Sequence, residues 1–443
     1  TSQTAQWRII MYKSISHLVL HYFRLLARLQ LKKNPRAIII GVTGSSGKTS
    51  TRLAIVQLLK TKGLVKHTVH ANSESGIPLN ILGLAPTTYS RLDWLRLICL
   101  APIRLLTLWE HYDYYVVEMG IDSPDSPKNM SYLLSILTPH IAVVLSASLT
   151  HAQNFDYLVK DRDATRRAKK ILHLIAREKM LLATAVGKSG VAIVNFDQIE
   201  FRPYLKKIQG RLLTFGTNPK ANLRIMPHFR FRYQGITAQL KSAELPAYYA
   251  YNLAATLAVG CALGIPLEQG VSRLSSYTPP PGRLRLFPGI KGSTIIDSSY
   301  NASPSTVSSA LDFLQQIGRN RVKIAVIGDM NELGHSAKQA HKDLADILPR
   351  YCDRVILFGP LTKAHTLPVL LAKHFPVMHF MSMSALVKYL SSSITPKSVV
   401  LVKGSQNQLY LERAVASILE DPKDLQYLCR RGKYWDHLRR QAP

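Results

Sequence analysis

The stretch GVTGSSGKTS, residues 41–50, decides how the rest of the chain is interpreted. Its glycines lie three apart, at Gly41, Gly44 and Gly47, and Lys48 and Thr49 follow directly; the usual phosphate-loop pattern would place a glycine at Val42 instead. An apolar run precedes the stretch and a helical pattern follows it, which is the context of a phosphate-binding loop. Backbone N–H groups and the helix N-terminus would face phosphates, with the lysine on the β- and γ-phosphates and the threonine on Mg²⁺. The stretch therefore predicts binding of ATP and Mg²⁺.

Around this loop, short apolar runs alternate with longer helical patterns, which is typical of a parallel sheet with crossover helices. Strands are expected at 37–42, 114–120, 140–148 and 190–197. Ligands of open parallel sheets bind beyond the carboxyl ends of the strands. The phosphate loop, Glu118 and the pair Thr150 and His151 all follow strand ends, so we expect these polar groups to meet at one edge.

A second α/β domain is predicted in the C-terminal part. Residues 198–245 look rich in strands, and a helix with small side chains follows at 247–264. SYTPPPGRLRLFPG, residues 276–289, then interrupts every periodicity with four prolines and two glycines, which indicates a domain boundary. The fold class is α/β: a P-loop central domain with a mostly parallel sheet, and a C-terminal Rossmann-like domain. The expected division is a basic N-terminal segment at 1–34, a central domain at 35–282 and a C-terminal domain at 283–443.

The first 33 residues combine apolar residues at helical spacing with Lys, Arg and His on the other side, so they predict a basic amphipathic helix. Such a helix could lie in a membrane interface, or it could pack on the protein's own next domain. A second basic and apolar stretch occurs at 91–110. We find no run of about 18 uncharged apolar residues that reads as a spanning helix.

The composition of the chain indicates which classes of partner it can bind. The chain of 443 residues has 57 Lys plus Arg against 27 Asp plus Glu, a net charge of +30, which favours a polyanionic partner such as nucleic acid or an anionic membrane. No RNA- or DNA-binding motif is present and the charge is spread, so nucleic acid is the weaker choice. Four cysteines without a C-x-x-C pair indicate neither a zinc site nor a disulfide framework, which is consistent with a reducing cytoplasm.

Three further residues, Glu118, His151 and Lys179, become functional candidates only through their surroundings. Glu118 ends an apolar strand, and as a hard oxygen donor it would suit Mg²⁺ beside a phosphate loop. A single His such as His151 is more often structural. By composition Lys179 would be one more surface lysine in a basic helix.

Five segments together resemble the Mur ligases of peptidoglycan synthesis. They are TGSSGKTS at 43–50, VVEMG at 116–120, IDSSYNASP at 296–304, AVIGDMNELGHS at 325–336 and LVKGSQN at 401–407. The last three most resemble the MurF type, which adds D-alanyl-D-alanine to UDP-N-acetylmuramoyl-tripeptide. The resemblance begins at about Pro35, so it implies a chain that lacks the family's usual N-terminal UDP-binding domain.

The resemblance implies an ADP-forming ligase. ATP would phosphorylate a peptide carboxylate, and an amine would displace phosphate from the acyl phosphate through a tetrahedral intermediate. The implied catalytic residues are Lys48, Lys179 and His151. The implied magnesium ligands are Thr49, Glu118, His151 and Lys179, the last as a carbamate. The implied nucleotide-binding residues are Gly44, Ser45, Ser46, Gly47, Lys48, Thr49, Ser50, Asn252, Arg283, Asp297, Tyr300 and Asn301.

The implied partners are a peptidoglycan precursor and D-alanyl-D-alanine, handled by a monomer in the cytoplasm. The basic helix suggests contact with the inner face of the membrane. Two alternatives remain open: a Mur-like ligase with another amino-acid or lipid-linked substrate, and a nucleic-acid-stimulated P-loop NTPase. Gln406 stands where an arginine is common in the family, so contacts to the substrate carboxylate are expected to differ.

Overall fold

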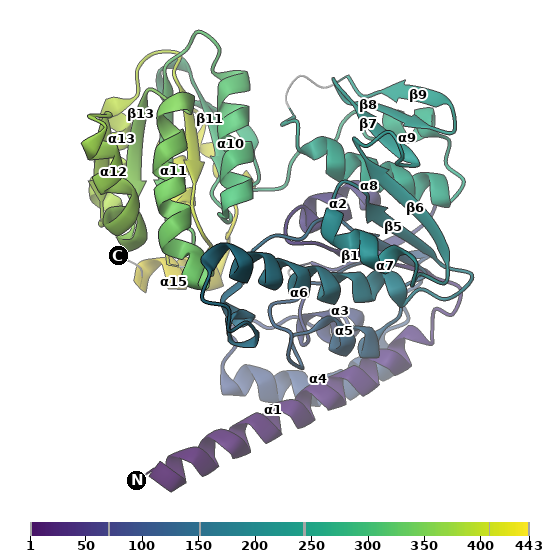
Figure 1. The fold of residues 1–443 in the computed structure, drawn as a ribbon. Coiled ribbons are helices and arrows are strands. Elements are labelled where there is room, and N and C mark those ends of the chain that lie inside the picture. The colour runs from purple at the N-terminus through teal and green to yellow at the C-terminus, as the bar shows by residue number, and fades with distance from the viewer. Residues whose placement is uncertain (1, 70, 150–151, 242–244, 407, 442–443) are drawn as a thin grey trace. The chain divides into compact units, whose positions relative to one another are not determined.

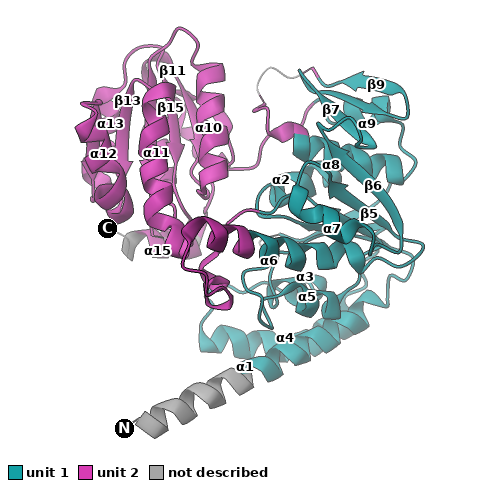
Figure 2. Ribbon diagram, in the orientation of Figure 1, with its two compact units in different colours: residues 1–147, 172–240, 251–275 teal, residues 148–171, 241–250, 276–443 magenta. Residues whose placement is uncertain are grey.

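The computed structural model describes residues 2–69, 71–149, 152–241, 245–406 and 408–441. These residues form two compact units, each with its own sheet (Figure 2). Unit 1 comprises residues 1–147, 172–240 and 251–275, and unit 2 comprises residues 148–171, 241–250 and 276–443. The division into domains at 35–282 and 283–443 stays a prediction.

The sheet of unit 1 has nine strands in the order β2-β3-β1-β4-β5-β6-β7-β8-β9. Pairing is parallel from β2 to β7 and antiparallel for β8 and β9. The strands are β1 Ile38–Thr43, β2 Val65–His67, β3 Tyr114–Glu118, β4 Ile141–Val144, β5 Val191–Asn195, β6 Arg211–Gly216, β7 Leu223–Met226, β8 Arg230–Tyr233 and β9 Ile236–Gln239. The expectation of a mostly parallel sheet that begins with the strand before the phosphate loop is confirmed.

The register of this sheet determines where the site lies. Val42 of β1 pairs with Glu118 of β3 on one side and with Val143 of β4 on the other. Because parallel strands end at the same edge, the phosphate loop after β1 lies beside the carboxyl ends of β3 and β4.

Helices cover this sheet, and two of them connect the units in sequence (Figure 1). In unit 1 the helices are α1 Ser2–Leu31, α2 Lys48–Leu59, α3 Gly76–Ile81, α4 Arg91–Thr107, α5 Met130–Ile136, η3 Ile199–Phe201, α7 Arg202–Leu205 and α9 Leu267–Arg273. Helices α6 Ala164–Thr184 and α8 Tyr249–Ala262 begin in unit 2 and continue in unit 1. Two short turns, η1 Ala152–Asn154 and η2 Asp156–Leu158, precede α6.

The predicted N-terminal helix is present as α1, and it packs on its own unit. Phe23 and Leu26 are buried in a cluster with Leu79, Leu97 and Ala101 of α3 and α4. Tyr22 Oη donates a hydrogen bond to the Ile98 carbonyl at 3.0 Å. The interpretation that the apolar face packs on the protein is therefore correct for these residues.

The sheet of unit 2 has six strands in the order β10-β11-β15-β12-β13-β14, parallel except for the antiparallel edge strand β10. The strands are β10 Arg285–Gly289, β11 Ser293–Ser298, β12 Lys323–Gly328, β13 Arg354–Phe358, β14 Val377–Phe380 and β15 Val399–Lys403. The helices are η4 Ile290–Gly292, α10 Pro304–Ile317, η5 Gly334–Ser336, α11 Ala337–Tyr351, η6 Thr362–Thr366, α12 Leu367–Ala372, α13 Met383–Ser393, α14 Glu412–Ala416, η7 Pro422–Tyr427 and α15 Lys433–Gln441.

Both faces of this second sheet are buried, as a Rossmann-like domain requires. Successive residues of β12 alternate between two cores: Ala325 and Ile327 pack with α10 and α11, whereas Ile324 and Val326 pack with α13 and α14. Strands buried on both faces read as continuous apolar runs, which explains why the sequence predicted them well.

Candidate functional site

The phosphate loop needs its glycines for two separate physical reasons. Gly47 has a φ of +82°, and a Cβ there would lie 2.3 Å from Asn252 Oδ1. A Cβ on Gly44 would lie 2.9 Å from the Leu145 Cβ. The first glycine adopts a left-handed backbone and both allow close packing, so the loop is held tightly against β4 and α8.

The loop is also fixed through Ser146, which follows β4. The backbone N–H of Ser45 donates to the Ser146 carbonyl at 2.9 Å, and that of Ser46 donates to Ser146 Oγ at 3.2 Å. Lys48 folds back, so that its ammonium donates to the Gly44 carbonyl at 2.8 Å. Its charge therefore lies over the loop, where the phosphates of a nucleotide would be neutralised.

Helix α2 begins at Lys48, with Gly47 as its N-cap and no side-chain cap. Four N–H groups at such an end have no partner within the helix, and together with the helix dipole they favour an anion. Ser50 and Thr49 lie in this first turn, and Ser50 is buried. The predicted phosphate-binding residues 44–50 are thus contiguous around a single helix N-terminus.

Two of the predicted magnesium ligands lie side by side. Thr49 Oγ1 donates a hydrogen bond to Glu118 Oε2 at 2.9 Å. Glu118 is buried, and its backbone N–H donates to Thr68 Oγ1 at 3.0 Å. A hydroxyl oxygen and a carboxylate oxygen at the phosphate loop form a donor pair that fits Mg²⁺.

Arg52, which the sequence did not single out, contacts the same carboxylate. Its Nε lies 3.5 Å from Glu118 Oε2, and its Nη1 lies 2.6 Å from His67 Nδ1. The arginine compensates the buried negative charge of Glu118. Its position four residues after Lys48, one helical turn further along α2, was the signal available in the sequence.

Lys179 is not the surface lysine that its composition suggested, because its side chain is only 3% exposed. It lies on the buried face of α6, four residues after the buried Ile175. Burial, and next the charge of Lys48, lower the pKa of Lys179 to about 7, while Asp122 and Glu178 act in the opposite direction. A large fraction of this amine is therefore neutral at neutral pH, as carbamylation requires.

The fourth predicted magnesium ligand, His151, lies outside the described residues, as does Thr150. In the part of the chain that the structure describes, no three His, Cys, Asp or Glu side chains form a group that could hold a metal. The predicted magnesium ligands are of a different kind, because they include the hydroxyl of Thr49 and the modified side chain of Lys179.

The side chain of Asn252 lies beside the loop and has one polar atom without a hydrogen-bond partner. The side chain is buried in α8, and across the described chain its Nδ2 finds no hydrogen-bond partner. Its Oδ1 lies next to Gly47. An amide donor that is buried without a partner costs free energy, so this atom fits a nucleotide acceptor.

Substituting Gly47 by alanine is expected to weaken ATP binding at least about tenfold, because left-handed strain and the contact with Asn252 both distort the loop. Titration calorimetry with ATP and Mg²⁺ measures this. Gly235→Ala is the matched control, since Gly235 has a φ of +85° with nothing within 4 Å of its added Cβ. It should retain the wild-type affinity; an equal loss in both variants would contradict a local role for Gly47.

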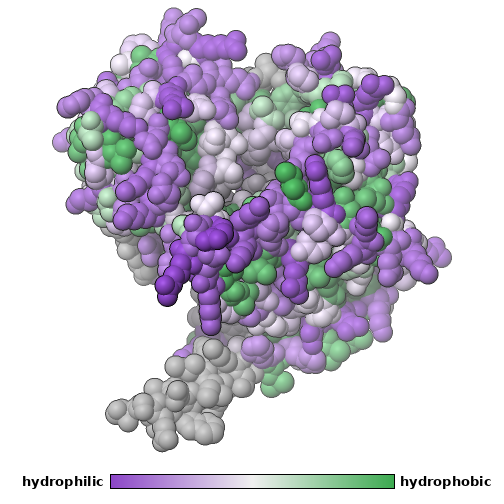
Figure 3. Space-filling view, viewed as in Figure 1, coloured by the Kyte–Doolittle hydropathy of each residue, from purple (hydrophilic) through white to green (hydrophobic). Residues whose placement is uncertain are grey.

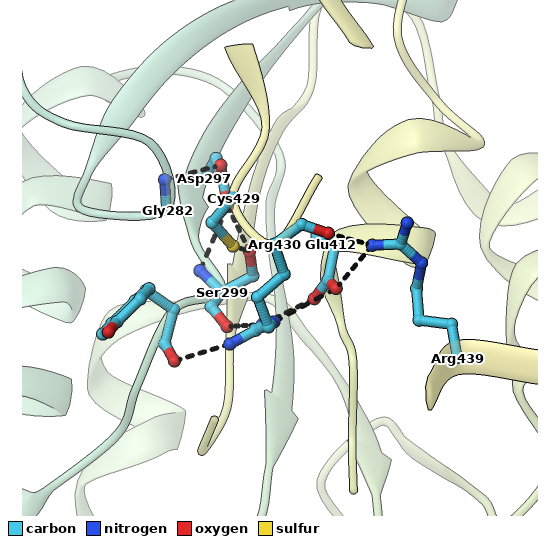
Figure 4. Close-up of polar contacts among 8 residues, drawn as sticks. Gly282, Asp297, Ser299, Glu412, Cys429, Arg430 and Arg439 are labelled. Atoms are coloured by element: carbon cyan, nitrogen blue, oxygen red, sulfur yellow. Dashed lines mark hydrogen bonds and ion pairs between the residues drawn. The ribbon is translucent and has the colours of Figure 1, made fainter. Parts of the chain in front are cut away.

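The other predicted nucleotide-binding residues lie in unit 2, and Figure 4 shows one of them, Asp297, with Gly282 and Ser299. Asp297 is buried near the end of β11, accepts hydrogen bonds from the Gly282 N–H at 3.0 Å and from Ser299 Oγ at 2.6 Å, and has a pKa raised by burial. The Arg283 guanidinium lies 4.2 Å from the centre of the Tyr300 ring. Asn301 follows, and its carbonyl accepts from Lys403 at 2.9 Å. These four predicted residues therefore form one cluster within their unit.

A buried ion pair supports this cluster from behind, and sequence reasoning did not find it. Arg430 Nη2 donates to Glu412 Oε2 at 2.5 Å, and to the Ser299 carbonyl at 2.7 Å. Arg430 Nη1 donates to the Tyr300 carbonyl at 2.9 Å, and the side chains of Arg430 and Glu412 are only 2% and 3% exposed (Figure 4). The pair thus fixes the backbone on which Tyr300 and Asn301 are carried.

Lys403 is a second buried lysine that the sequence did not single out. It ends β15, donates to Ser298 Oγ at 3.1 Å, and burial, followed by the charge of Arg283, lowers its pKa to about 7. A lysine directly after the apolar run SVVLV was the available signal. Its position places a titratable amine beside the Asn301 carbonyl.

Comparisons with known proteins identify the family that this chain matches. The model of the Mur ligase middle domain matches residues 42–260, and that of the Mur ligase glutamate ligase domain matches residues 282–406. The chain is 26% identical over 406 residues to UDP-N-acetylmuramoyl-tripeptide–D-alanyl-D-alanine ligase of Rickettsia prowazekii, covering 88% of this chain and 80% of the relative. The ligase of the same name from Bacillus subtilis is 26% identical over 397 residues, with 87% and 76% covered.

Solved structures share the fold. The MurF ligase of Thermotoga maritima in complex with ADP aligns with a TM-score of 0.71 at 23% identity, covering 96% of this chain and 85% of that one. Folylpolyglutamate synthase of Thermotoga maritima aligns with a TM-score of 0.58 at 14% identity, covering 96% and 99%. At these identities the likeness concerns the fold alone.

Proposed function

The chain belongs to the Mur ligase family, and we propose that it joins D-alanyl-D-alanine to UDP-N-acetylmuramoyl-tripeptide with hydrolysis of ATP to ADP and phosphate. The observation that carries the proposal is the group formed by Lys48, Thr49, Glu118 and the buried Lys179 at the end of the parallel strands. The names of the relatives from Rickettsia prowazekii and Bacillus subtilis support this choice of substrates.

We propose that ATP and Mg²⁺ bind at the phosphate loop. Lys48 holds the β- and γ-phosphates, and Asn252 donates to the nucleotide. Thr49, Glu118 and a carbamate on Lys179 hold the ion, and His151 is retained as a proposed fourth ligand. When bound, Mg²⁺ supplies neutralisation of the phosphate charge.

The reaction is an activation followed by a displacement. A peptide carboxylate oxygen attacks the γ-phosphorus of ATP, giving an acyl phosphate and ADP. The amine of D-alanyl-D-alanine then adds to the acyl carbon, loses a proton, and expels phosphate from the tetrahedral intermediate. Lys48 is placed to stabilise charge on the transferring phosphoryl group, which is the largest expected contribution to such a transfer.

For the cluster in unit 2 we propose a second nucleotide contact. The flat faces of Arg283 and Tyr300 are stacked, and Asp297 fixes the turn that carries Tyr300 and Asn301. A stacked guanidinium offers donors in a plane that suits phosphate or ribose oxygens. The proposed domain division, 1–34, 35–282 and 283–443, assigns this cluster to the C-terminal domain.

We further propose a cytoplasmic monomer whose N-terminal helix touches the inner face of the membrane. Leu18, Leu25 and Leu29 of α1 are exposed, and Arg28 and Lys32 lie among them. Over the residues that the structure describes, every helix is too short or too polar to cross a bilayer.

The test is phosphate release from ATP with UDP-N-acetylmuramoyl-tripeptide and D-alanyl-D-alanine, each omitted in turn, with the product mass recorded. We expect release only with both, and a pentapeptide product. If phosphate release needs a lipid-linked acceptor or another amino acid, the proposed substrates are wrong, but the proposed ligase activity stands. Release stimulated by polynucleotide instead would reject the ligase, and Lys48→Met serves as the inactive control.

A further inference from the structure

Helix α4 is apolar on two opposite faces. Leu97 and Ala101 are buried against α1, in the cluster with Phe23. The opposite face also carries apolar side chains, and these are exposed: Leu92 at 78%, Leu95 at 57%, Ile103 at 53% and Leu106 at 74%. These four residues, spaced so that they follow one side of the helix, are called the α4 stripe below.

An apolar surface of this kind is unusual for a monomer, which normally exposes large apolar residues singly. The side of the molecule drawn in Figure 3 is mostly hydrophilic, with hydrophobic side chains in small groups. Helix α4 is drawn faintly in Figure 1, so it lies away from the viewer in that orientation.

The helix that carries the α4 stripe is held at its middle and at its C-terminal end by α1 and by Lys33, which follows α1. Tyr22 donates to the Ile98 carbonyl, and Gln30 Nε2 donates to the Leu108 carbonyl at 2.9 Å. Lys33 donates to the carbonyls of Leu105 and Leu108. Pro102 has no N–H for the Ile98 carbonyl, and the helix end leaves the carbonyls of Leu105 and Leu108 open, so these donors satisfy groups that the helix itself cannot.

The exposed charged residues of α4 are Arg91, Arg96 and Arg104, and all three are basic. The acid of this helix, Asp93, is buried and accepts from the N–H groups of Thr87 and Thr88 and from Arg96, whose charge it compensates. One exposed acid, Glu110, follows Trp109 and pairs with Lys66. Helix α1 adds exposed leucines and basic residues of its own, as described above. Trp109, 75% exposed, follows α4, and the Lys33 ammonium lies 4.2 Å from its ring centre.

We propose that the α4 stripe, with its arginines and Trp109, is the main contact of this protein with an anionic lipid bilayer. The inference deepens the membrane contact proposed above by moving its centre from α1 to α4. A helix of 17 residues with an apolar outer side and basic flanks suits burial in the plane of the interface, with a tryptophan at headgroup level.

Charge and chemistry favour a lipid surface over other occupants. Leucine and isoleucine side chains offer no stacking planes or hydrogen bonds for nucleic acid bases. A second copy of this chain would carry the same net charge of +30, and this repulsion opposes self-association. An anionic bilayer satisfies the apolar stripe and the arginines together.

Flotation of the full chain with vesicles tests the proposal. We expect binding to phosphatidylcholine vesicles that contain phosphatidylglycerol, and weak binding to phosphatidylcholine alone. The double variant Leu95→Gln with Leu106→Gln should bind at least about tenfold more weakly, because it removes apolar side chains from the lipid. Arg104→Gln should cost about fivefold, the expected contribution of one basic residue near the membrane surface.

Matched controls lie in unit 2. Leu371 in α12 is 56% exposed, close to the 57% of Leu95, and Arg319 is exposed. Leu371→Gln and Arg319→Gln should bind vesicles like the wild type. Absence of wild-type binding to anionic vesicles, or equal losses in the controls, would overturn the proposal. A dimer in ultracentrifugation that is lost with Leu95→Gln and Leu106→Gln, without vesicle binding, would also overturn it and assign the stripe to self-association.

The ligase assay separates this inference from the proposed reaction. In solution without vesicles, the double stripe variant should release phosphate at the wild-type rate, since both side chains are exposed and neither is a proposed ligand of ATP or Mg²⁺. Failure of vesicle binding with normal ligation would therefore reject the surface alone.

Discussion

Replacing Lys179 by alanine should lower the rate of ligation by on the order of 10³-fold, the scale on which a single charge-stabilising group acts in catalysis. The side chain is buried next to Lys48, and in the proposed mechanism its carbamate supplies an oxygen ligand for Mg²⁺. Alanine removes that ligand. It also removes the negative charge that the carbamate would place near the positive charges of the site, Lys48 and Arg52. Single-turnover phosphate release at saturating ATP measures the effect.

Lys169→Ala is the matched control, because Lys169 lies on the same helix and is exposed. It should retain wild-type activity. A carbamate signal in ¹³C NMR after addition of labelled bicarbonate is expected for the wild type and for Lys169→Ala, and should disappear in Lys179→Ala. An active Lys179→Ala variant, or a wild type without the signal, would contradict the proposed role.

The pH dependence has a definite sign. A lysine with the ordinary pKa of 10.5 is almost fully protonated at neutral pH, whereas burial lowers the pKa of Lys179 to about 7. Only the neutral amine reacts with CO₂, so the carbamate should be lost as the pH falls from about 8 to about 6. The carbamate signal and the activity should decline together over this interval.

Arg430→Met should lower the free energy of unfolding of unit 2 by about 3–5 kcal/mol, because removing one partner strands a buried charge. Glu412 would lose its main partner, and the carbonyls of Ser299 and Tyr300 would lose their donors. The turn that carries Tyr300 would loosen, so the KM for ATP should rise as well. Denaturant unfolding and steady-state kinetics measure the two effects.

Lys373→Met provides the matched comparison in the same unit. Lys373 pairs with Asp346, and their side chains are 39% and 59% exposed. This variant should cost about 0–1 kcal/mol, since solvent screens an exposed pair. The double variant Glu412→Leu with Arg430→Met should recover part of the loss, because no buried charge is left alone. Equal losses in Arg430→Met and Lys373→Met would contradict the role of burial.

The sequence predicted those parts of the site that local patterns determine. Strand β1, the phosphate loop and helix α2 are contiguous, and parallel strands with ends at one edge bring Glu118 to Thr49. The resemblance to the Mur ligases added Lys179 and Asn252, which no local pattern distinguishes. Both lie on helices and reach the loop only through tertiary packing.

What the sequence did not predict depends on contacts between distant segments. Arg430 and Glu412 lie in a part of the chain with short helices and weak periodicity, so their pairing had no signature. Lys179 was misjudged because the many basic residues of α6 conceal its buried face. Two edge strands of the second sheet lack a continuous apolar run: β14 has only four residues and is partly exposed, and β10 contains Pro288 and lies in the stretch that indicates a domain boundary.

The packing of α1 determines whether the residues before position 35 can be removed without harm to folding. Phe23 and Leu26 cover Leu97 and Ala101, and Gln30 and Lys33 occupy carbonyls at the end of α4. A gene fragment that starts at residue 35 would retain every residue of the phosphate loop, yet its product would expose both faces of α4. Such a fragment should accumulate in inclusion bodies, because α1 is part of the packed core of its unit.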